Sequence, residues 1–468
     1  MSKVIQFSIP EKPDFSKIAN VSRNLNQTSI ETIIEFTKKN IERFNVAQFL
    51  YILDLITFST QYKLEAFQII RLYMESKYYS PLDALLQIEN YLASRVLKKF
   101  EDQESYSEFY SIFDSYYKTR FKQASFKNHA SGSGILFFVH NPVFLAHTNP
   151  LLEILEHRTC DYNISIASLG SNFEFEQKCA SMKVNFIHLK GNTFLEKLRN
   201  LEAISSDYKH IVWQCLPVFL SFASARISNI SWWSFKFNPP ISQVRKCITS
   251  LPTSETEQTI NNNVWHNFTP GFNLKNTNQS PGNWLKRNGV IGAFCREELI
   301  DDLEYWKVLA KLLTSNPKLS FKYCGRTQIH EKWVARFGIN REQVNYLGWL
   351  EAPEQALLNV AVVLDTFKIR HGLLGMEAMA AGIPIIYPEV EKNFGGLVDL
   401  YKRLPKTCTV PDPDTYASFK SIEAAKLLIE RAALDQHTNE SIASKQKQII
   451  NAFPRENFQK FVSVLSVE

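Results

Sequence analysis

The chain has 468 residues, 45% of them hydrophobic and 21% charged, which is an ordinary composition for a folded protein of two or three domains. Its net charge of +6 is small for this length, so the composition suits an anionic small ligand and does not indicate nucleic acid binding. The seven cysteines are scattered without a C-x-x-C pair, and no apolar run suits a signal peptide or a transmembrane segment. We therefore expect free thiols and a cytoplasmic protein.

Residues 1–130 are predicted to form an all-helical N-terminal domain. Apolar residues recur at helical spacing from Ile30 and again from Phe49, with further candidate helices at 61–76, 82–99 and 103–119. No convincing repeat of about 34 residues is present, so a tetratricopeptide array is not supported. Two interpretations stay open. The region either caps a catalytic core or, being rich in Tyr and Phe, is a platform for an acceptor or partner protein.

A polar stretch of small residues, 127–134, then marks a domain boundary. From Ile135 short apolar strands alternate with helices, which predicts a parallel sheet covered on both faces over residues 134–250. Strands are expected at 135–140, 163–168, 184–188, 210–215 and about 230–236, and residues 224–240 are expected to hold the last strand. The polar residues that follow predict a connection over 251–287, with a mobile loop.

Two histidines stand at and after the end of the first of these strands. His140 lies at its end and His147 lies further along the connection that follows. The first strand-to-helix connection of such a domain opens at the ligand-binding edge of the sheet, so either imidazole is a candidate general base. The alternative is that His147 is an ordinary residue at the start of a helix.

A second α/β domain is predicted over 288–468. Strands are expected at 288–294, 319–324 and 344–349, and closing helices at 395–404, 413–434, 437–452 and from 457. Arg296 follows the first strand, and its planar guanidinium suits a phosphate. Alternatively, Arg296 is a surface residue that caps a helix. No strand is followed by G-x-G-x-x-G, which disfavours an NAD-binding enzyme.

Residues 362–388 form the most informative stretch of the chain. An apolar strand ends near Asp365, a polar loop with Gly372 follows, and a helix over 373–381 stops at Gly382 before a second apolar strand. Such a loop lies at the carboxyl edge of a sheet, where the first amides of the helix favour phosphate. Glu377 lies about one turn inside the helix, where it either reaches a ribose or is simply a solvated helix residue.

This stretch resembles the donor-site signature of glycosyltransferases with the GT-B fold. The matching pattern is Leu-Asp-Thr, a Gly/His pair, Gly-Met-Glu and Ala-Gly-x-Pro, read without a gap. It is closest to the group of protein O-GlcNAc transferases and bacterial cytoplasmic N-glycosyltransferases. The resemblance implies two Rossmann-like doubly wound domains facing a cleft, here preceded by the helical domain. It also implies a last helix that returns to the first sheet.

The resemblance further implies which residues bind the nucleotide-sugar donor. Glu377 aligns with the acidic residue that binds the ribose, and the amides near Gly372, Leu373 and Leu374 would hold the diphosphate. The remaining candidates for the donor site are Arg296, Asp365, Arg370 and His371, with Lys368 as a helper. Two departures stand out, because the family's phosphate-binding Lys aligns with Leu299 and its two Thr hydroxyls align with Leu373 and Leu374.

The implied activity is hexosyl or N-acetylhexosaminyl transfer from a UDP-sugar to a protein side chain or a glycan. No cofactor is expected besides this donor substrate. No Asp-x-Asp motif stands in a loop that suits a metal, so a metal-independent mechanism is the simplest hypothesis. Ile369 stands where many retaining enzymes carry a second Glu, which favours inversion. The departures leave an alternative, in which the chain is a non-catalytic partner of an active glycosyltransferase paralogue, bound through the helical domain.

Overall fold

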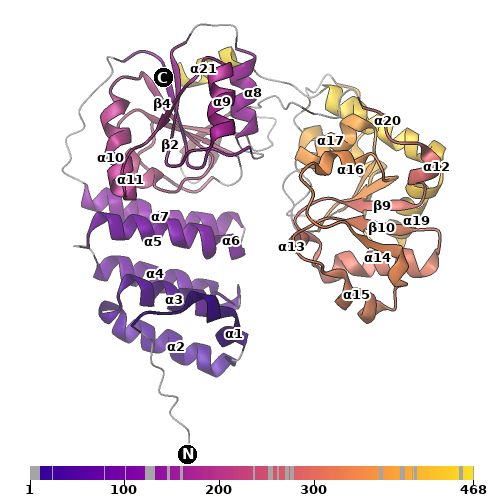
Figure 1. The fold of residues 1–468 in the computed structure, drawn as a ribbon, viewed down its shortest axis with the longest axis horizontal. Coiled ribbons are helices and arrows are strands. Elements are labelled where there is room, and N and C mark those ends of the chain that lie inside the picture. Colours follow the sequence, from indigo (N-terminus) through magenta and orange to yellow (C-terminus); the bar gives the residue numbers. More distant parts are fainter. Residues whose placement is uncertain are drawn as a thin grey trace, which may run out of the picture. The chain divides into compact units, whose positions relative to one another are not determined.

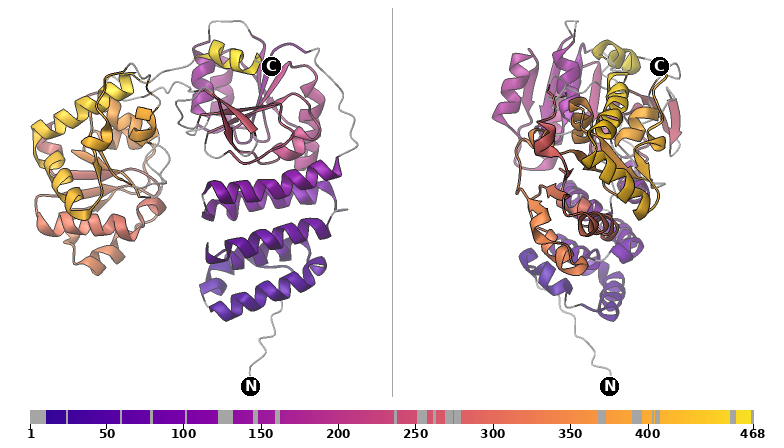
Figure 2. Two further views of the ribbon diagram at one scale, coloured as in Figure 1. Left: turned by 180° about the vertical axis from the view of Figure 1, so that it is seen from behind. Right: turned by 90° about the vertical axis from the view of Figure 1, so that its right-hand side faces the viewer.

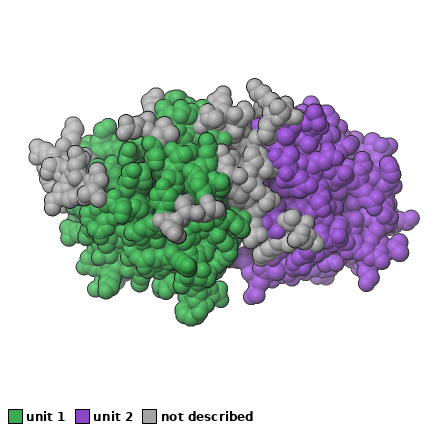
Figure 3. Space-filling view, turned by 90° about the horizontal axis from the view of Figure 1, so that it is seen from above, with its two compact units in different colours: residues 1–251, 255–268, 457–468 green, residues 252–254, 269–456 purple. Residues whose placement is uncertain are grey.

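The computed structural model describes residues 11–23, 25–58, 60–77, 80–100, 102–121, 132–144, 148–158, 162–235, 238–250, 257–260, 263–268, 274, 279–367, 373–389, 396–402, 404, 408–452 and 457–466. The chain forms two compact units (Figure 3). Unit 1 comprises residues 1–251, 255–268 and 457–468, and unit 2 comprises residues 252–254 and 269–456.

The N-terminal part of unit 1 is helical, as the apolar spacing predicts. Side chains of Asn26, Asn45 and Asp102 accept backbone N–H groups at the first turns of three of these helices, which fixes where those helices begin. The helices lie in layers (Figures 1 and 2). They are α1 (Ile18–Arg23), α2 (Gln27–Asn40), α3 (Val46–Ile56), α4 (Lys63–Ser76), α5 (Leu82–Arg95), α6 (Leu97–Phe100) and α7 (Gln103–Arg120).

The rest of unit 1 is built on a sheet with the strand order β3-β2-β1-β4-β5-β6-β8-β7. All neighbouring strands are parallel except β7 and β8, which pair antiparallel. The strands are β1 (Ile135–Val139), β2 (Ile164–Ser168), β3 (Asn185–His188), β4 (His210–Gln214), β5 (Ile230–Ser234), β6 (Lys246–Thr249), β7 (Glu257–Ile260) and β8 (Asn263–Asn267). The helices between them are α8 (Asn149–Glu156), α9 (Phe173–Ser181), α10 (Phe194–Ser205) and α11 (Leu220–Ser224).

The prediction that residues 224–240 hold the last strand of this sheet is wrong. Strands β6, β7 and β8 follow, and the last two lie inside the stretch that we expected to be a connection. The segment Asn263–Asn267 is polar at three of its five positions, and only Trp265 is fully buried. A hairpin at the edge of a sheet needs few apolar residues, so its composition resembles that of a loop.

We call the N-terminal helices α1 to α7 together the helical layer. The helical layer and the first sheet share one hydrophobic core. Helix α7 packs on α11 and α5 packs on α10, as Figure 1 shows. At this junction the ring of Tyr117 lies edge-on to Phe222, with 5.5 Å between the centroids. The expected subdivision of this unit at residue 130 stays a prediction.

The last helix, α21 (Phe458–Ser466), belongs to unit 1 although its chain neighbours lie in unit 2. Its Phe461 contacts the rings of Phe137, Trp233 and Phe268. The ammonium of Lys246 donates to the carbonyl of Val464 at 2.7 Å. The expected return of the C-terminal helix to the first sheet is confirmed.

Unit 2 is a second parallel sheet, in the order β11-β10-β9-β12-β13-β14, with helices around it (Figure 1). The strands are β9 (Val290–Ala293), β10 (Ser320–Tyr323), β11 (Val344–Tyr346), β12 (Val362–Leu364), β13 (Ile385–Pro388) and β14 (Ser418–Phe419). The helices are α12 (Trp284–Arg287), α13 (Glu297–Ile300), α14 (Leu303–Ser315), α15 (His330–Phe337), α16 (Pro353–Leu357), α17 (Leu373–Ala381), α18 (Gly396–Lys402), α19 (Ile422–Leu434) and α20 (Gln436–Ala452).

The expected helix over 413–434 is wrong in its first part. A 3-10 turn at Pro413–Thr415 and the short strand β14 precede α19, which begins only at Ile422. Ser421 caps that helix by accepting the N–H of Ala424. Pro413 is the first residue of the turn, where its missing N–H is not needed, and the turn ends at Tyr416, which has left the helical conformation.

Candidate functional site

Each sheet has one point at which the strand order reverses, and ligands of open α/β sheets bind at the carboxyl edge there. In unit 2 this switch point lies between β9 and β12, because the chain runs from β9 outward to β11 and then returns to β12. In unit 1 it lies between β1 and β4. The predicted donor-site residues follow β9 and β12, and the predicted base candidates follow β1.

Strand β12 ends in a buried polar pair at the switch point of unit 2. Asp365 and Thr366 are both buried, and a carboxylate oxygen of Asp365 accepts the N–H of Thr366 at 2.8 Å. The hydroxyl of Tyr305 donates to the carbonyl of Leu364 at 3.0 Å. These bonds fix the backbone at the point where the chain leaves the sheet.

Helix α17 carries Glu377, which is only 4% exposed. The alternative that Glu377 is a solvated helix residue is therefore wrong. The other residues of α17 are apolar or Gly, and the helix stops at Gly382, which has a left-handed φ of 77°, as predicted. A carboxylate buried on such a helix needs polar partners or a polar ligand.

The structure describes only some of the other predicted residues around α17. Leu373 begins α17 and Leu374 is half-buried in its first turn. Gly372, His371 and Arg370, together with Lys368, lie outside the described residues. The structure thus brings Asp365, Leu373, Leu374 and Glu377 to the β12 edge of the switch point.

Arg296 lies on the other side of this switch point, in the connection after β9. It is exposed and occupies the residue before α13, but its side chain makes no capping hydrogen bond to that helix. Arg296 thus follows β9 at the carboxyl edge, and its side chain does not cap the helix.

Glu297, next to Arg296, was not singled out from the sequence. Its carboxylate accepts the backbone N–H groups of Arg326 and Thr327, both at 3.0 Å. Burial alone would raise the pKa of Glu297, but hydrogen bonds from its own N–H and from those two amides hold it below the ordinary value. A Cβ on Gly325 would lie 2.7 Å from this carboxylate, so a larger residue there would displace the Glu297 side chain. Glu297 thus stays ionised and ties the connection after β9 to the one after β10.

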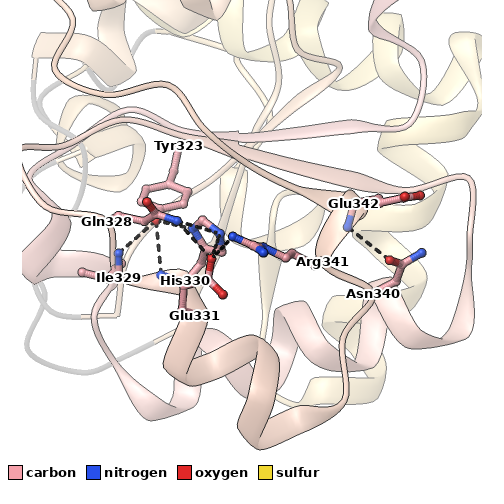
Figure 4. A network of polar contacts seen from close by, with 8 residues as sticks. All are labelled: Tyr323, Gln328, Ile329, His330, Glu331, Asn340, Arg341 and Glu342. Carbon is pink, nitrogen blue, oxygen red and sulfur yellow. Dashed lines mark hydrogen bonds and ion pairs between the residues drawn. The ribbon is translucent and has the colours of Figure 1, made fainter.

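The connection after β10 is also held at its other end, where it enters α15, as Figure 4 shows. The oxygen of Tyr323 accepts the N–H groups of Ile329 and His330, which leaves its own proton for Nδ1 of His330 at 2.8 Å. Burial lowers the pKa of His330 below its ordinary value, in keeping with this neutral tautomer. These hydrogen bonds hold the start of α15 against the end of β10.

An exposed cation and aromatic pair lies beside this loop, with Arg326 in the connection after β10 and Trp349 in the connection after β11. The guanidinium of Arg326 lies 4.9 Å from the ring centroid of Trp349, which is 60% exposed and follows β11. Sequence reasoning missed both residues. The signal that could have found them is their position, since Arg326 follows the strand expected at 319–324 and Trp349 ends the strand expected at 344–349.

In unit 1, His140 comes directly after β1 and is half-buried at the switch point. Its ring centroid lies 5.7 Å from that of Phe219, in the connection after β4. His147 lies outside the described residues. Of the two histidines, His140 is thus placed at the edge where a base is expected.

The connection after β4 is tightly anchored around His140. Two of its residues, Cys215 and Phe219, have left-handed φ angles of 67° and 65°. The N–H of Cys215 donates to the carbonyl of Trp233 at 2.7 Å, and the indole N–H of Trp213 donates to the carbonyl of Leu216 at 2.8 Å. Non-glycine residues in this conformation are held there by their surroundings and cluster at functional sites.

Among the described residues, no group of three His, Cys, Asp or Glu side chains is placed to hold a metal ion. In the same part of the chain, no helix has both the length and the apolar character needed to cross a membrane.

Comparison with known proteins finds no matching family model and no matching curated protein. Solved structures do match. A mutant O-GlcNAc transferase from Thermobaculum terrenum is similar at 12% identity and a TM-score of 0.54, over 96% of this chain and 94% of that one. Anabaena HepE in complex with UDP matches at 15% identity and a TM-score of 0.51, over 71% of this chain and 99% of its own. A glycosyltransferase from Rickettsia africae matches at 13% identity and a TM-score of 0.51, over 72% and 100%. The chain therefore has the GT-B fold, as predicted, preceded by a helical region.

Proposed function

We propose that this protein is a glycosyltransferase that moves a hexosyl or N-acetylhexosaminyl group from a UDP-sugar to a protein side chain or a glycan. The observation that carries the proposal is Glu377, a buried carboxylate on an otherwise apolar helix beside the switch point of the second sheet. A ribose offers two hydroxyl donors to such a carboxylate. The solved complex of Anabaena HepE with UDP, which shares the fold, supports UDP as the nucleotide.

The diphosphate of the donor would lie between the connection after β9 and the start of α17. Arg296 supplies a charged fork, and the first amides of the helix, at Leu373 and Leu374, supply donors. Arg370 and His371, which precede α17 in the chain, would add positive charge. These groups would stabilise the negative charge that grows on the departing nucleoside diphosphate.

The nucleoside base would extend along the edge towards β10 and β11. Arg326 and Trp349 present a planar face there, and Arg326 lies on a loop that Glu297 and Tyr323 hold in place. Base stacking on an aromatic ring stabilises such complexes, and a loop fixed in advance loses little entropy on binding.

At the switch point of the first sheet, His140 would act as the general base that removes a proton from the acceptor nucleophile. His147 is the second candidate for this role. The fixed donors and the charge of Arg296 would take the place of a divalent cation, so we propose metal-independent transfer. A cytoplasmic location likewise stays a proposal.

UDP release from UDP-glucose and UDP-N-acetylglucosamine, measured on the full chain with and without chelator, tests this function. Slow release that persists in chelator is expected, since donor hydrolysis accompanies transferase activity when the acceptor is water. Release that stops in chelator and returns with manganese would contradict the metal-independent mechanism. Arg296→Ala should lose the activity, whereas Arg336→Ala, on the exposed side of α15, should retain it.

One observation favours a second candidate function, a non-catalytic partner of an active glycosyltransferase. Leu299, Leu373 and Leu374 stand where the similar family carries a Lys and two Thr residues, so phosphate-binding groups are lost. Such a protein would bind UDP without releasing it from any UDP-sugar. Nucleotide binding without turnover, in the presence of a panel of protein and glycan acceptors, would support this second function.

A further inference from the structure

The helical layer bonds directly to the connections that follow the carboxyl ends of β3, β4 and β5. In the described part of the chain, four of its side chains accept backbone N–H groups from those connections. Asp83 accepts from Leu195 at 3.3 Å, Glu89 from Phe219 at 2.7 Å, Gln103 from Asn238 at 3.0 Å and Asp114 from Ser242 at 3.2 Å. The helical layer thus supplies acceptors to the ligand-binding edge of the first sheet.

Glu89 differs from the other three because it is fully buried, whereas they are half-buried. It lies on α5 among Leu85, Leu86 and Leu92, and its second oxygen accepts the hydroxyl of Tyr117 at 3.4 Å. Burial raises the pKa of Glu89 to about 8, although the Phe219 amide and the Tyr117 hydroxyl oppose the rise. Burying an acidic side chain costs free energy of folding, and a hydrophobic residue would be more favourable at this position. The carboxyl is therefore explained by the hydrogen bond that it makes.

The partner that Glu89 holds is the left-handed residue Phe219. Phe219 is fully buried and has φ 65° and ψ 0°, a conformation that a residue with a Cβ adopts only under constraint. It precedes α11, and its carbonyl accepts the N–H of Ala223 at 2.9 Å. Its ring packs against Phe194 at 4.9 Å and against His140 at 5.7 Å.

We infer that Glu89 is a positioning residue for the switch point of the first sheet. By accepting the N–H of Phe219 it holds the left-handed turn before α11, and the ring of Phe219 in turn fixes the orientation of the His140 imidazole. A residue of the helical layer thereby sets the geometry of the acceptor-side edge. The effect of Glu89 on the His140 ring follows from the contacts of Glu89 with Phe219 and of Phe219 with His140, and it does not depend on the proposed function. Its consequence for transfer rests on the proposed role of His140.

The test uses the full chain and three variants. Glu89→Leu removes the acceptor, Glu89→Gln keeps an oxygen for the Phe219 N–H, and Asp114→Leu removes a comparable junction bond far along the edge, at Ser242. Peptide-resolved hydrogen exchange reports on residues 216–222. The ring signal of His140, assigned with His140→Gln in protein carrying labelled histidine, reports on the imidazole.

Glu89→Leu should raise exchange over 216–222 by about tenfold or more and shift the His140 signal. Glu89→Gln should restore both towards the wild-type values, and Asp114→Leu should raise exchange near Ser242 only. Unchanged exchange and an unchanged His140 signal in Glu89→Leu would overturn the inference, and so would general loosening of unit 1 without a change at His140. If Glu89→Leu does not fold, Glu89→Asp, which draws the carboxyl back from Phe219 by one methylene, replaces it with the same expectations.

These readouts need no transferase activity, so they separate this inference from the proposed function. Once transfer is measured, Glu89→Leu should lower kcat while the KM for the donor is unchanged. A shifted His140 signal with an unchanged kcat would leave the positioning intact and count against His140 as the base.

Discussion

The carboxylate of Glu297 accepts the backbone N–H of Arg326 at 3.0 Å, and this contact joins the connections after β9 and β10. Arg296, next to Glu297, is exposed at this edge, and Arg326 lies against Trp349. Glu297 therefore fixes the backbone next to Arg296 and Arg326, and Arg326 in turn contacts Trp349. Its lowered pKa keeps it ionised, which strengthens both of its bonds to amides.

Glu297→Ala should lower the free energy of unfolding by about 1–3 kcal/mol, because two half-buried amides lose their charged acceptor. It should also weaken binding of UDP, since the loop that carries Arg326 is no longer held in place. Chemical denaturation and calorimetric titration measure the two effects. Glu298→Ala, exposed on the same helix, is the control, and equal behaviour of the two variants would show that the loop is fixed by other contacts.

The buried carboxyl of Glu89 should make stability depend on pH. Its folded pKa of about 8 lies above its ordinary value of 4.5, so the folded state holds a proton that the unfolded state has released. Its contribution is fully present below about pH 4.5 and is lost as pH rises to about 8. Denaturation across this range should show a smaller fall for Glu89→Gln than for the wild type. The exposed Glu75→Gln should follow the wild type, and identical profiles for all three would refute the buried state of Glu89.

The C-terminal helix should contribute strongly to the stability of unit 1. Phe461 is fully buried and contacts the rings of Phe137, Trp233 and Phe268. Phe461→Ala should therefore destabilise the unit by about 3–5 kcal/mol, measured by chemical denaturation. Ser463→Ala, exposed on the same helix, should cost far less. A similar small loss in both variants would mean that α21 is not part of this core.

The role proposed for His140 predicts that its substitution slows transfer without weakening donor binding. His140→Gln should lower the rate of transfer by roughly 10²- to 10⁴-fold, the range typical of a general base. Nucleotide binding should not change, because His140 and the donor-site residues belong to different units. His157→Gln, an exposed imidazole at the end of α8, is the control. Full transfer activity in His140→Gln would leave His147 as the remaining candidate.

Much of the fold follows from local sequence. Continuous apolar runs predict the buried parallel strands, and the stop of α17 at Gly382 follows from the left-handed freedom of glycine. Strands β7 and β8 were missed because an edge hairpin has polar composition, and β14 because a strand of two residues has no periodicity to detect.

The site was less predictable than the fold, since its key contacts join distant residues. The positions of Glu377, Arg296 and His140 follow from their places after strands. The roles of Glu297 and Glu89 depend on amides 29 and 130 residues away in the chain. Such contacts become visible only when the elements are assembled.

The central claim is that the edge beside Glu377 binds a UDP-sugar, and nucleotide-dependent thermal stability tests it most directly. UDP, GDP, ADP, CMP and their common sugars would be compared on wild type, Glu377→Ala and Gln446→Leu. Gln446 bonds both backbone groups of Ile385 at the opposite end of β13, so its variant controls for general destabilisation. A ligand at a hundred times its Kd should add about 2.7 kcal/mol of stability. UDP or a UDP-sugar should give a stabilisation that Gln446→Leu keeps and Glu377→Ala loses. No stabilisation of the wild type by any nucleotide would contradict binding at this edge.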